Sequence, residues 1–488
     1  MTDTYFKPTA PGNYRITVKS LAVMLIFAVA LIIGIVSALL PDLMLWLISI
    51  LIWLLCLCLL IKLGSFKFIS PIGFFFIIYT LFIYTGGLIL FFSGGKGAAF
   101  TSGEHNYQFF LAITVGLFGL CLGALFANIS AGYKPKEETT LFREKPWADT
   151  LKGGAAGLCL GILSVLAITC TLVYVTSRGV LPLIQALESF GLPESYAANI
   201  ASRIQFTAYG EGGGSYFFQG YFGQFYQVVL PFSALFSMAK FLYSKDKRWM
   251  ASWIGLSLIA AFFLMLSLQR WRILVFIILT FLVYNLYRFR LGKGSILAVT
   301  LAGVCAYAFL GVARGIPVDF IFQDFTQRIL LGQIIDTYPV FEIYPEYADF
   351  RYGYIVFNDL WGLLPGPNIG SGTLLYALMY PNSLYIGSAS TSYGMLGELY
   401  ADFGLAWLIG SMAVYGFVMQ VSLIWFVRSK KSLLKLVFFA FLIMSFGWLA
   451  LSGFVGFLDL CLMGVVICVV FMVVVTSILR LKSIEEHA

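Results

Sequence analysis

Charged residues are scarce in this chain, and their scarcity excludes most soluble folds. Only 11% of the 488 residues are Asp, Glu, Lys or Arg, whereas 60% are hydrophobic and the mean hydropathy is +0.92. A typical soluble protein has about 25% charged residues. In a bilayer, by contrast, apolar side chains face lipid and each helix satisfies its own backbone hydrogen bonds. We therefore predict an all-α, polytopic membrane protein.

Residues that build metal, disulfide and cofactor sites are also rare. The only histidines are His105 and His487, and all eight cysteines lie within apolar runs, where they serve as small packing residues. This arrangement predicts no disulfide framework and no cluster of His and Cys. No compact acidic cluster or Asp-x-Asp motif lies in a predicted outer loop. We therefore expect neither a metal ion nor another cofactor.

Long apolar runs follow one another along the whole chain. A membrane-spanning helix needs about twenty predominantly apolar residues. Such runs lie at about residues 20–40, 43–61, 69–92, 108–131, 153–176, 223–243, 250–268, 273–287, 295–313, 403–427, 433–452 and 458–479. They predict about twelve transmembrane helices in a single domain, residues 1–488. Because residues 1–19 are polar and lack a small-residue cleavage site, we expect the first run to be an uncleaved span.

Lysine and arginine cluster in alternate connections between these runs. With a cytoplasmic N-terminus, the inner segments hold 23 of the 31 basic residues, as the positive-inside rule requires. The net charge of +8 therefore reflects topology and not nucleic-acid binding, and both termini are predicted to be cytoplasmic. Two long outer loops result, 177–222 and 314–402, and loops of this length are usually functional. Within them we expect short helices at 194–206 and 318–336, the second amphipathic and lying at the outer interface.

The basic residues predicted on the outer side are arginines, with the single exception of Lys96. They are Arg178, Arg203, Arg270, Arg272, Arg314, Arg328 and Arg351. The planar guanidinium fork matches phosphate and carboxylate oxygens, which gives a reason for choosing arginine over lysine. Two alternatives stay open. The arginines pair with acids of the same loops, such as Glu188, Asp319 and Glu346, or they are interfacial anchors that reach phospholipid headgroups.

The aromatic segment 338–361 (YPVFEIYPEYADFRYGYIVFNDLW) also allows two interpretations. Rings beside carboxylates and amides suit sugars, which have apolar C–H faces and polar rims. An aromatic belt at the membrane surface explains the rings equally well but leaves the interleaved acids without a role.

The end of the second long loop reads NSLYIGSASTSYGMLGELYADFGLAWLIG, residues 382–410. It resembles the loop-to-helix signature of Wzy-type polymerases, which join lipid-linked oligosaccharide repeats into O-antigen or related polysaccharides. Helix number, cytoplasmic termini and two large outer loops are similar as well. In each long loop an arginine is followed, after ten intervening residues, by a glycine: Arg203 by Gly214 and Arg351 by Gly362. This is similar to the paired loop motif of that family.

The resemblance implies a glycosyltransferase of the bacterial inner membrane. Its donor would be a glycan on a polyprenyl diphosphate, its acceptor a sugar hydroxyl on a second lipid-linked repeat, and a chain-length regulator protein would be a further partner. Negative charge grows on the leaving diphosphate, and preorganised guanidinium groups stabilise such charge. We expect Arg270 and Arg272 in LQRWRI, with Arg314 in GVARG, to hold the diphosphate without a metal ion.

The remaining predicted site residues serve proton transfer and substrate binding. Glu398 and Asp402 lie four residues apart, on one helix face, and are the candidates for a general base. The predicted substrate-binding residues are Arg178, Arg203, Arg328, Arg351, Tyr352 and Tyr393.

Two further functions share this layout. A flippase or other transporter of lipid-linked oligosaccharides would have about twelve helices too, with shorter loops and with central helices that carry charge or are broken by Gly or Pro. An O-antigen ligase resembles the chain more closely, but those enzymes carry a functional histidine in the large outer loop. Loop 314–402 contains no histidine, which favours the polymerase. The sugars, the linkage and its anomeric outcome stay open.

Overall fold

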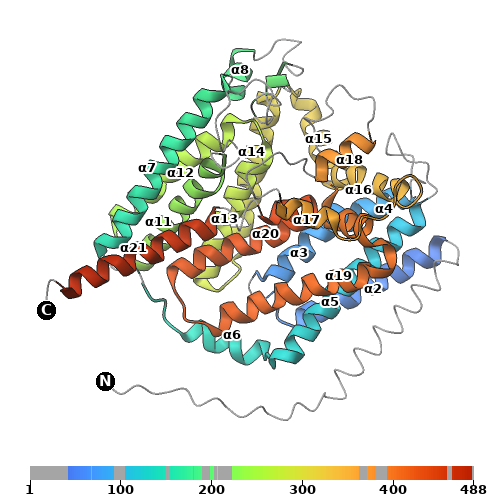
Figure 1. Cartoon of the computed structure of the whole chain (residues 1–488), viewed down its shortest axis with the longest axis horizontal. Coiled ribbons are helices and arrows are strands. Elements are labelled where there is room, and N and C mark those ends of the chain that lie inside the picture. Colours follow the sequence, from blue (N-terminus) through green and yellow to red (C-terminus); the bar gives the residue numbers. More distant parts are fainter. Residues whose placement is uncertain are drawn as a thin grey trace.

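The structure, a computed structural model, describes residues 42–66, 69–92, 105–149, 151, 153–179, 181–189, 198–199, 201–202, 206, 223–361, 371–379, 393–458 and 464–485. Within these ranges every regular element is a helix, and the only extended pairing is an isolated bridge between Ala148 and Ser432. Long helices cross one another obliquely, while several short helices gather at one end of the bundle (Figure 1). The predicted all-α class is confirmed.

Ten helical stretches in the described ranges are long and apolar enough to cross a membrane, so the protein is a multi-pass membrane protein. They are α2 (Asp42–Lys62), the continuous α3–η1–α4 (Pro71–Tyr79, Thr80–Tyr84, Thr85–Phe92), α5 (Asn106–Ala131), α7 (Gly153–Arg178), η2–α11 (Phe225–Val229, Leu230–Ser244), α12 (Lys247–Leu266), α13 (Arg270–Arg288), α14 (Lys293–Ala313), α19 (Gly394–Arg428) and α20 (Leu433–Phe457). The last predicted span corresponds to α21 (Val465–Glu485), whose apolar part is shorter. The predicted span 20–40 lies outside the described residues.

Connections that are predicted to be cytoplasmic meet at one end of the bundle. Arg428, at the end of α19, forms an ion pair of 2.7 Å with Glu138 of α6 (Pro135–Glu144). The Trp147 indole donates a hydrogen bond of 3.0 Å to the Tyr287 carbonyl. These contacts join three basic connections that are far apart in the sequence. Three of the connections that the basic clusters place on one side therefore do lie together in the fold.

The opposite end carries α8 (Pro182–Glu188) and four short helices between α14 and α19. These are α15 (Val318–Leu330), α16 (Gly332–Ile343), α17 (Tyr354–Trp361) and α18 (Ser371–Met379). The prediction of one amphipathic helix over 318–336 is wrong at its end, because Leu331 leaves the helical conformation and separates α15 from α16. Of the helix predicted at 194–206, only residues 198–199, 201–202 and 206 are described, and they are helical. Helix α19 begins at Gly394, before the predicted span 403–427, and it is broken at Gly404, close to the predicted start of that span.

Helices α5 and α19 pack with their backbones in contact. A Cβ atom on Gly123 would lie 1.8 Å from the Ala413 carbonyl oxygen, and one on Gly416 would lie 1.9 Å from the Leu120 oxygen. Small residues allow such close approach in membrane bundles, where dispersion contacts drive helix association. The glycines of these two spans therefore fix the central helix pair.

We expect Gly123→Ala to lower the thermal unfolding temperature of the detergent-solubilised protein, because the added methyl group must displace backbone. Overpacking of this kind costs about 1–3 kcal/mol or more. Gly410→Ala is the matched control on α19, since a Cβ there meets nothing within 4 Å. Equal melting temperatures for the two variants would show that the α5–α19 contact is not tight.

Candidate functional site

Two membrane-spanning helices are broken at glycines close to the end that carries the short helices. Gly404 in α19 has φ 66° and ψ −175°, and Gly453 in α20 has φ 67° and ψ −158°. Each break interrupts the ladder of backbone hydrogen bonds. Backbone groups that lose their helical partners in a water-free interior need others. The side chains and amides that supply these partners define the candidate site.

At the first break, the partners come from the segment that leads into α17. The Arg351 and Tyr352 amides donate hydrogen bonds of 2.9 and 2.8 Å to the carbonyls of Ala401 and Asp402. The Asp402 carboxylate, which is fully buried, in turn accepts hydrogen bonds from the Ile355 and Val356 amides at 3.1 and 3.3 Å. These amides belong to the first turn of α17, where a carboxylate complements the helix dipole. Asp402 is therefore an N-cap that is supplied by another helix.

At the second break, Glu398 has the equivalent role. Its two oxygens accept hydrogen bonds of 3.0 and 2.8 Å from the Phe454 amide, directly after Gly453. A Cβ on Gly453 would lie 2.2 Å from the Glu398 carboxylate, so only glycine fits there. Gln333 of α16 donates a hydrogen bond of 2.7 Å to the Leu451 carbonyl, which lies just before the same break.

The two carboxylates predicted as candidate bases therefore make the contacts of structural caps. Glu398 is 1% exposed and Asp402 is fully buried. One turn apart on α19, as their spacing predicts, they serve two different breaks. Their assignment as a base stays a prediction, and the role that the geometry gives them is to hold the short helices.

Hydrogen exchange should separate the two caps. In Asp402→Ala, we expect the Ile355 and Val356 amides to exchange about tenfold faster, because the loss of an N-cap costs about 1–2 kcal/mol. In Glu398→Ala, the Phe454 amide should be affected and α17 should not. Each variant is the control for the other, and a uniform loss of protection in both would contradict this division.

Three consecutive residues at the start of α13 lie in different directions, since each helical position turns by about 100°. The Arg270 guanidinium lies 4.3 Å from the centre of the Tyr307 ring on α14 and pairs with Asp324 of α15. Trp271 stacks on Trp448 of α20, with 5.0 Å between ring centres. Arg272 lies on a third side, against Tyr226.

Asp324 neutralises Arg270. Tyr307 also donates a hydrogen bond of 2.6 Å to the Asp324 carboxylate. Burial by itself raises the pKa of Asp324, but the hydrogen bonds from Arg270 and Tyr307, together with the charge of Arg270, outweigh burial and lower the pKa below its usual value. The carboxylate is therefore ionised at neutral pH. It links α13, α14 and α15.

Arg178 and Arg272 flank one pair of tyrosines. Arg272 lies 5.0 Å from the centre of the Tyr226 ring, and Arg178 lies 4.8 Å from that of Tyr174. The two rings are 5.6 Å apart. Both arginines are buried, with exposures of 6% for Arg178 and 8% for Arg272. The end of the bundle that is opposite the basic connections thus has two buried cations around one aromatic pair.

The partner of Arg272 lies on a π-helical turn. With its amide oxygen facing the guanidinium, Gln227 accepts hydrogen bonds of 3.2 and 3.3 Å from Arg272. Tyr226 and Gln227 belong to η2, at the start of the span that continues as α11. Isolated π-helical turns of this kind frequently occur at functional sites.

The remaining predicted site residues have separate partners. Arg314 donates two hydrogen bonds to the Leu268 carbonyl, one of them 2.9 Å long from Nε, and so fixes the turn between α12 and α13. Arg328 is 66% exposed and lies 4.0 Å from Asp324. The structure therefore joins Arg270 to Arg328 through Asp324. Arg270 contacts Asp324, Arg272 contacts Gln227, and Arg314 contacts the Leu268 carbonyl.

The other predicted substrate-binding residues lie in different environments. Arg351 donates a hydrogen bond of 3.4 Å to the Tyr344 hydroxyl, and this bond raises the pKa of Arg351. Tyr352 is exposed, whereas Tyr393 is buried and its carbonyl accepts a hydrogen bond from Thr337. Arg203 lies outside the described residues.

Sequence reasoning missed Asp324 and the tyrosines at positions 174, 226 and 307. Two of these contacts do have a local signal. Asp324 and Arg328, like Tyr174 and Arg178, are four residues apart and therefore neighbours on a helix. The acids expected to pair with the outer arginines were others, and one of them, Glu346, lies 3.4 Å from His105.

The aromatic segment 338–361 divides into two parts. Tyr338, Phe341 and Tyr344 are buried core residues of α16 and of the turn after it. Tyr347 and Trp361 are among the exposed rings of the second part. Only the second part is therefore available for a sugar or for the membrane surface.

Comparison of the chain with protein-family models, with curated proteins and with solved structures finds no match.

Proposed function

We propose that this protein is a glycosyltransferase of the bacterial inner membrane. In this proposal it polymerises oligosaccharide repeats that are linked to polyprenyl diphosphate, at the outer face of that membrane. The observation that carries the proposal is the buried arginine pair, Arg178 and Arg272, beside Tyr174 and Tyr226. The positive-inside pattern supports an outer location for this end.

The reaction explains why arginine suits this site. The acceptor hydroxyl oxygen forms a bond to the anomeric carbon of the donor sugar and loses its proton. The bond between that carbon and the diphosphate oxygen breaks, and the lipid diphosphate leaves with the electron pair. Guanidinium groups held in a dry site stabilise this growing negative charge without having to reorganise. A guanidinium over a ring still has its N–H donors in its own plane, where they can bind phosphate oxygens.

Helix α15, which contacts Arg270 on a different side of α13 from the arginine pair, suits a lipid-linked substrate. Helix α15 has no buried residue, and Val318 and Phe322 on it are 71% and 76% exposed. Asp324 holds it to α13 and α14 through Arg270 and Tyr307. An amphipathic helix of this kind lies at a membrane interface, where a prenyl chain stays in lipid while its diphosphate and glycan reach polar groups. In this proposal Arg270, Arg314, Glu398 and Asp402 are positioning residues.

We expect Arg272→Lys and Arg178→Lys to fold but to lose polymerisation. Lysine keeps the charge and loses the planar fork, and loss of one donor to a developing charge typically lowers the rate about a hundredfold or more. Purified variants would be incubated with lipid-linked repeats, and the glycan ladder would be read on a gel.

Arg288→Lys is the control. Arg288 lies at the other end of the same helix, 5.0 Å from the centre of the Tyr284 ring, so it makes a contact of the same kind at the basic end. A normal ladder from Arg288→Lys and none from the two outer variants is the expected result. Normal ladders from all three would overturn the proposed site.

The broken helices favour a second candidate, a transporter of lipid-linked oligosaccharides. Transporters often bind their substrates at discontinuous helices, and both α19 and α20 are discontinuous. Reconstitution into vesicles distinguishes the two functions. Growth of the glycan on one face, with no movement of single repeats across the bilayer, supports the polymerase. Movement of repeats without growth supports the transporter.

A further inference from the structure

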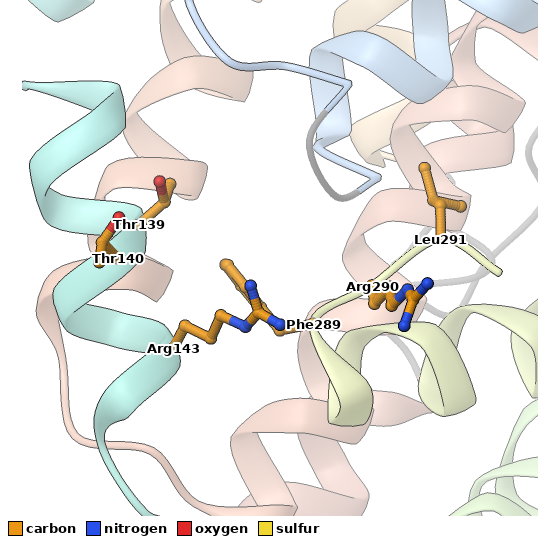
Figure 2. Close-up of a pocket in the computed structure, with 6 residues that line it drawn as sticks. All are labelled: Thr139, Thr140, Arg143, Phe289, Arg290 and Leu291. Carbon is orange, nitrogen blue, oxygen red and sulfur yellow. The ribbon is translucent and has the colours of Figure 1, made fainter.

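A pocket lies at the basic end of the molecule, away from the candidate site. Its volume is about 550 Å³, and it is lined by Thr139, Thr140, Arg143, Phe289, Arg290 and Leu291. Figure 2 shows that the first three belong to α6 and that the Arg143 side chain extends toward Phe289 in the connection between α13 and α14. Small-molecule sites have volumes of about 300–1,000 Å³. The pocket is therefore large enough for more than a single inorganic anion.

The α6 wall of the pocket is held rigidly. The Phe142 ring is fully buried, with ring-centre distances of 5.1 Å to both Phe289 and Phe426. Lys431 donates hydrogen bonds of 3.2 and 2.6 Å to the carbonyls of Arg143 and Lys145. The backbone at Arg143 is therefore fixed in position by its contacts with α13 and α19.

The opposite wall is fixed as well. Phe289 ends α13 in the left-handed conformation, with φ 50°, and the Arg290 amide donates a hydrogen bond of 3.2 Å to the Asn285 carbonyl. The Asn285 side chain accepts a hydrogen bond of 2.9 Å from Ser295 at the start of α14. The turn that carries Arg290 therefore has a defined shape.

The two pocket arginines are available to a ligand. Both are exposed, and neither guanidinium has an ion pair or hydrogen bond to another residue in the described part of the chain. Several neighbouring acids are already neutralised, since Glu137 pairs with Lys134, Glu138 with Arg428 and Asp149 with Lys240.

Positive charge is crowded around the pocket. Burial, followed by the charge of Lys145, lowers the pKa of Lys431 to about 8. An anion bound between Arg143 and Arg290 would reduce the mutual repulsion of these cations.

We propose that this pocket binds a phosphate-bearing anion and that its source is the headgroup of an anionic phospholipid in the cytoplasmic leaflet. The pocket turn lies between two spans, Arg270–Arg288 and Lys293–Ala313, and therefore at the level of the headgroups. That leaflet is rich in anionic lipid, which basic pockets between helices bind. Phe289 and Leu291 offer the apolar contacts that a glycerol backbone and the first acyl carbons need. This site is independent of the proposed polymerase activity.

Native mass spectrometry of the full chain tests the proposal. Protein released from nanodiscs of phosphatidylglycerol should retain one tightly bound lipid molecule more than protein from nanodiscs of phosphatidylcholine. The double variant R143Q/R290Q should bind phosphatidylglycerol about 25-fold more weakly, because each basic residue near anionic headgroups contributes roughly a factor of five. Both side chains are exposed, so the variant is expected to fold, and R290Q alone should show about a fivefold loss.

Arg248→Gln is the matched control. It removes the same charge from another exposed site at the basic end, at the start of α12. Equal retention of phosphatidylglycerol by R143Q/R290Q and R248Q would overturn the proposal. Displacement of the retained lipid by millimolar glycerol phosphate or inorganic phosphate, with no preference between the two lipids, would overturn the lipid as the source and leave a site for a soluble phosphate compound.

Discussion

Every buried backbone group in a membrane protein must find a hydrogen-bond partner, and the breaks at Gly404 and Gly453 place this constraint at the centre of the fold. The partners come from Glu398 and Asp402, one turn apart on α19, and from the segment that leads into α17. An unsatisfied backbone group in hydrocarbon costs several kcal/mol. If the short helices moved away from the spans, the backbone groups at the breaks would lose their hydrogen-bond partners. The end of the molecule that they cover is therefore built as one unit with the spans.

The arginine site depends on the same unit through Trp271. Its ring stacks on Trp448, five residues before the break in α20, while its two neighbours on α13 turn toward α15 and η2. A shift of α20 would therefore displace both Arg270 and Arg272. Helix α20 packs closely on α3, where a Cβ on Gly447 would lie 2.4 Å from the Phe74 ring, and this contact opposes such a shift. The packing of α20 thus helps to fix the positions of Arg270 and Arg272.

The sequence predicted the spans well, because a run of about twenty apolar residues has few alternatives in a membrane protein. The grouping of basic connections at one end followed from the same distribution of lysine and arginine. The breaks were not predictable in this way. A glycine inside an apolar run can serve close packing, as Gly123 and Gly416 do, or a change of backbone direction, as Gly404 and Gly453 do. Only the positions of the neighbouring segments decide between the two.

The sequence predicted several residues of the site, but it did not predict most of their contacts. The spacing of Glu398 and Asp402 correctly placed them on one face, but their partners, Phe454 and Ile355, come from distant segments that no local pattern links. Arg270 and Arg272 are only two positions apart in the sequence, yet they are about 200° apart around the helix. Arg270 therefore contacts an acid, Asp324, and Arg272 contacts an aromatic ring, Tyr226. Burial gives the two positions different chemistry. An ion pair neutralises Arg270, whereas the ring of Tyr226 and the amide of Gln227, both uncharged, contact Arg272. A guanidinium held beside aromatic rings in a dry site suits an anionic ligand, and the contacts of Arg272 and Arg178 with Tyr226 and Tyr174 are the physical reason for proposing that these two arginines bind the diphosphate. Arg270, which pairs with Asp324, is proposed to have a positioning role.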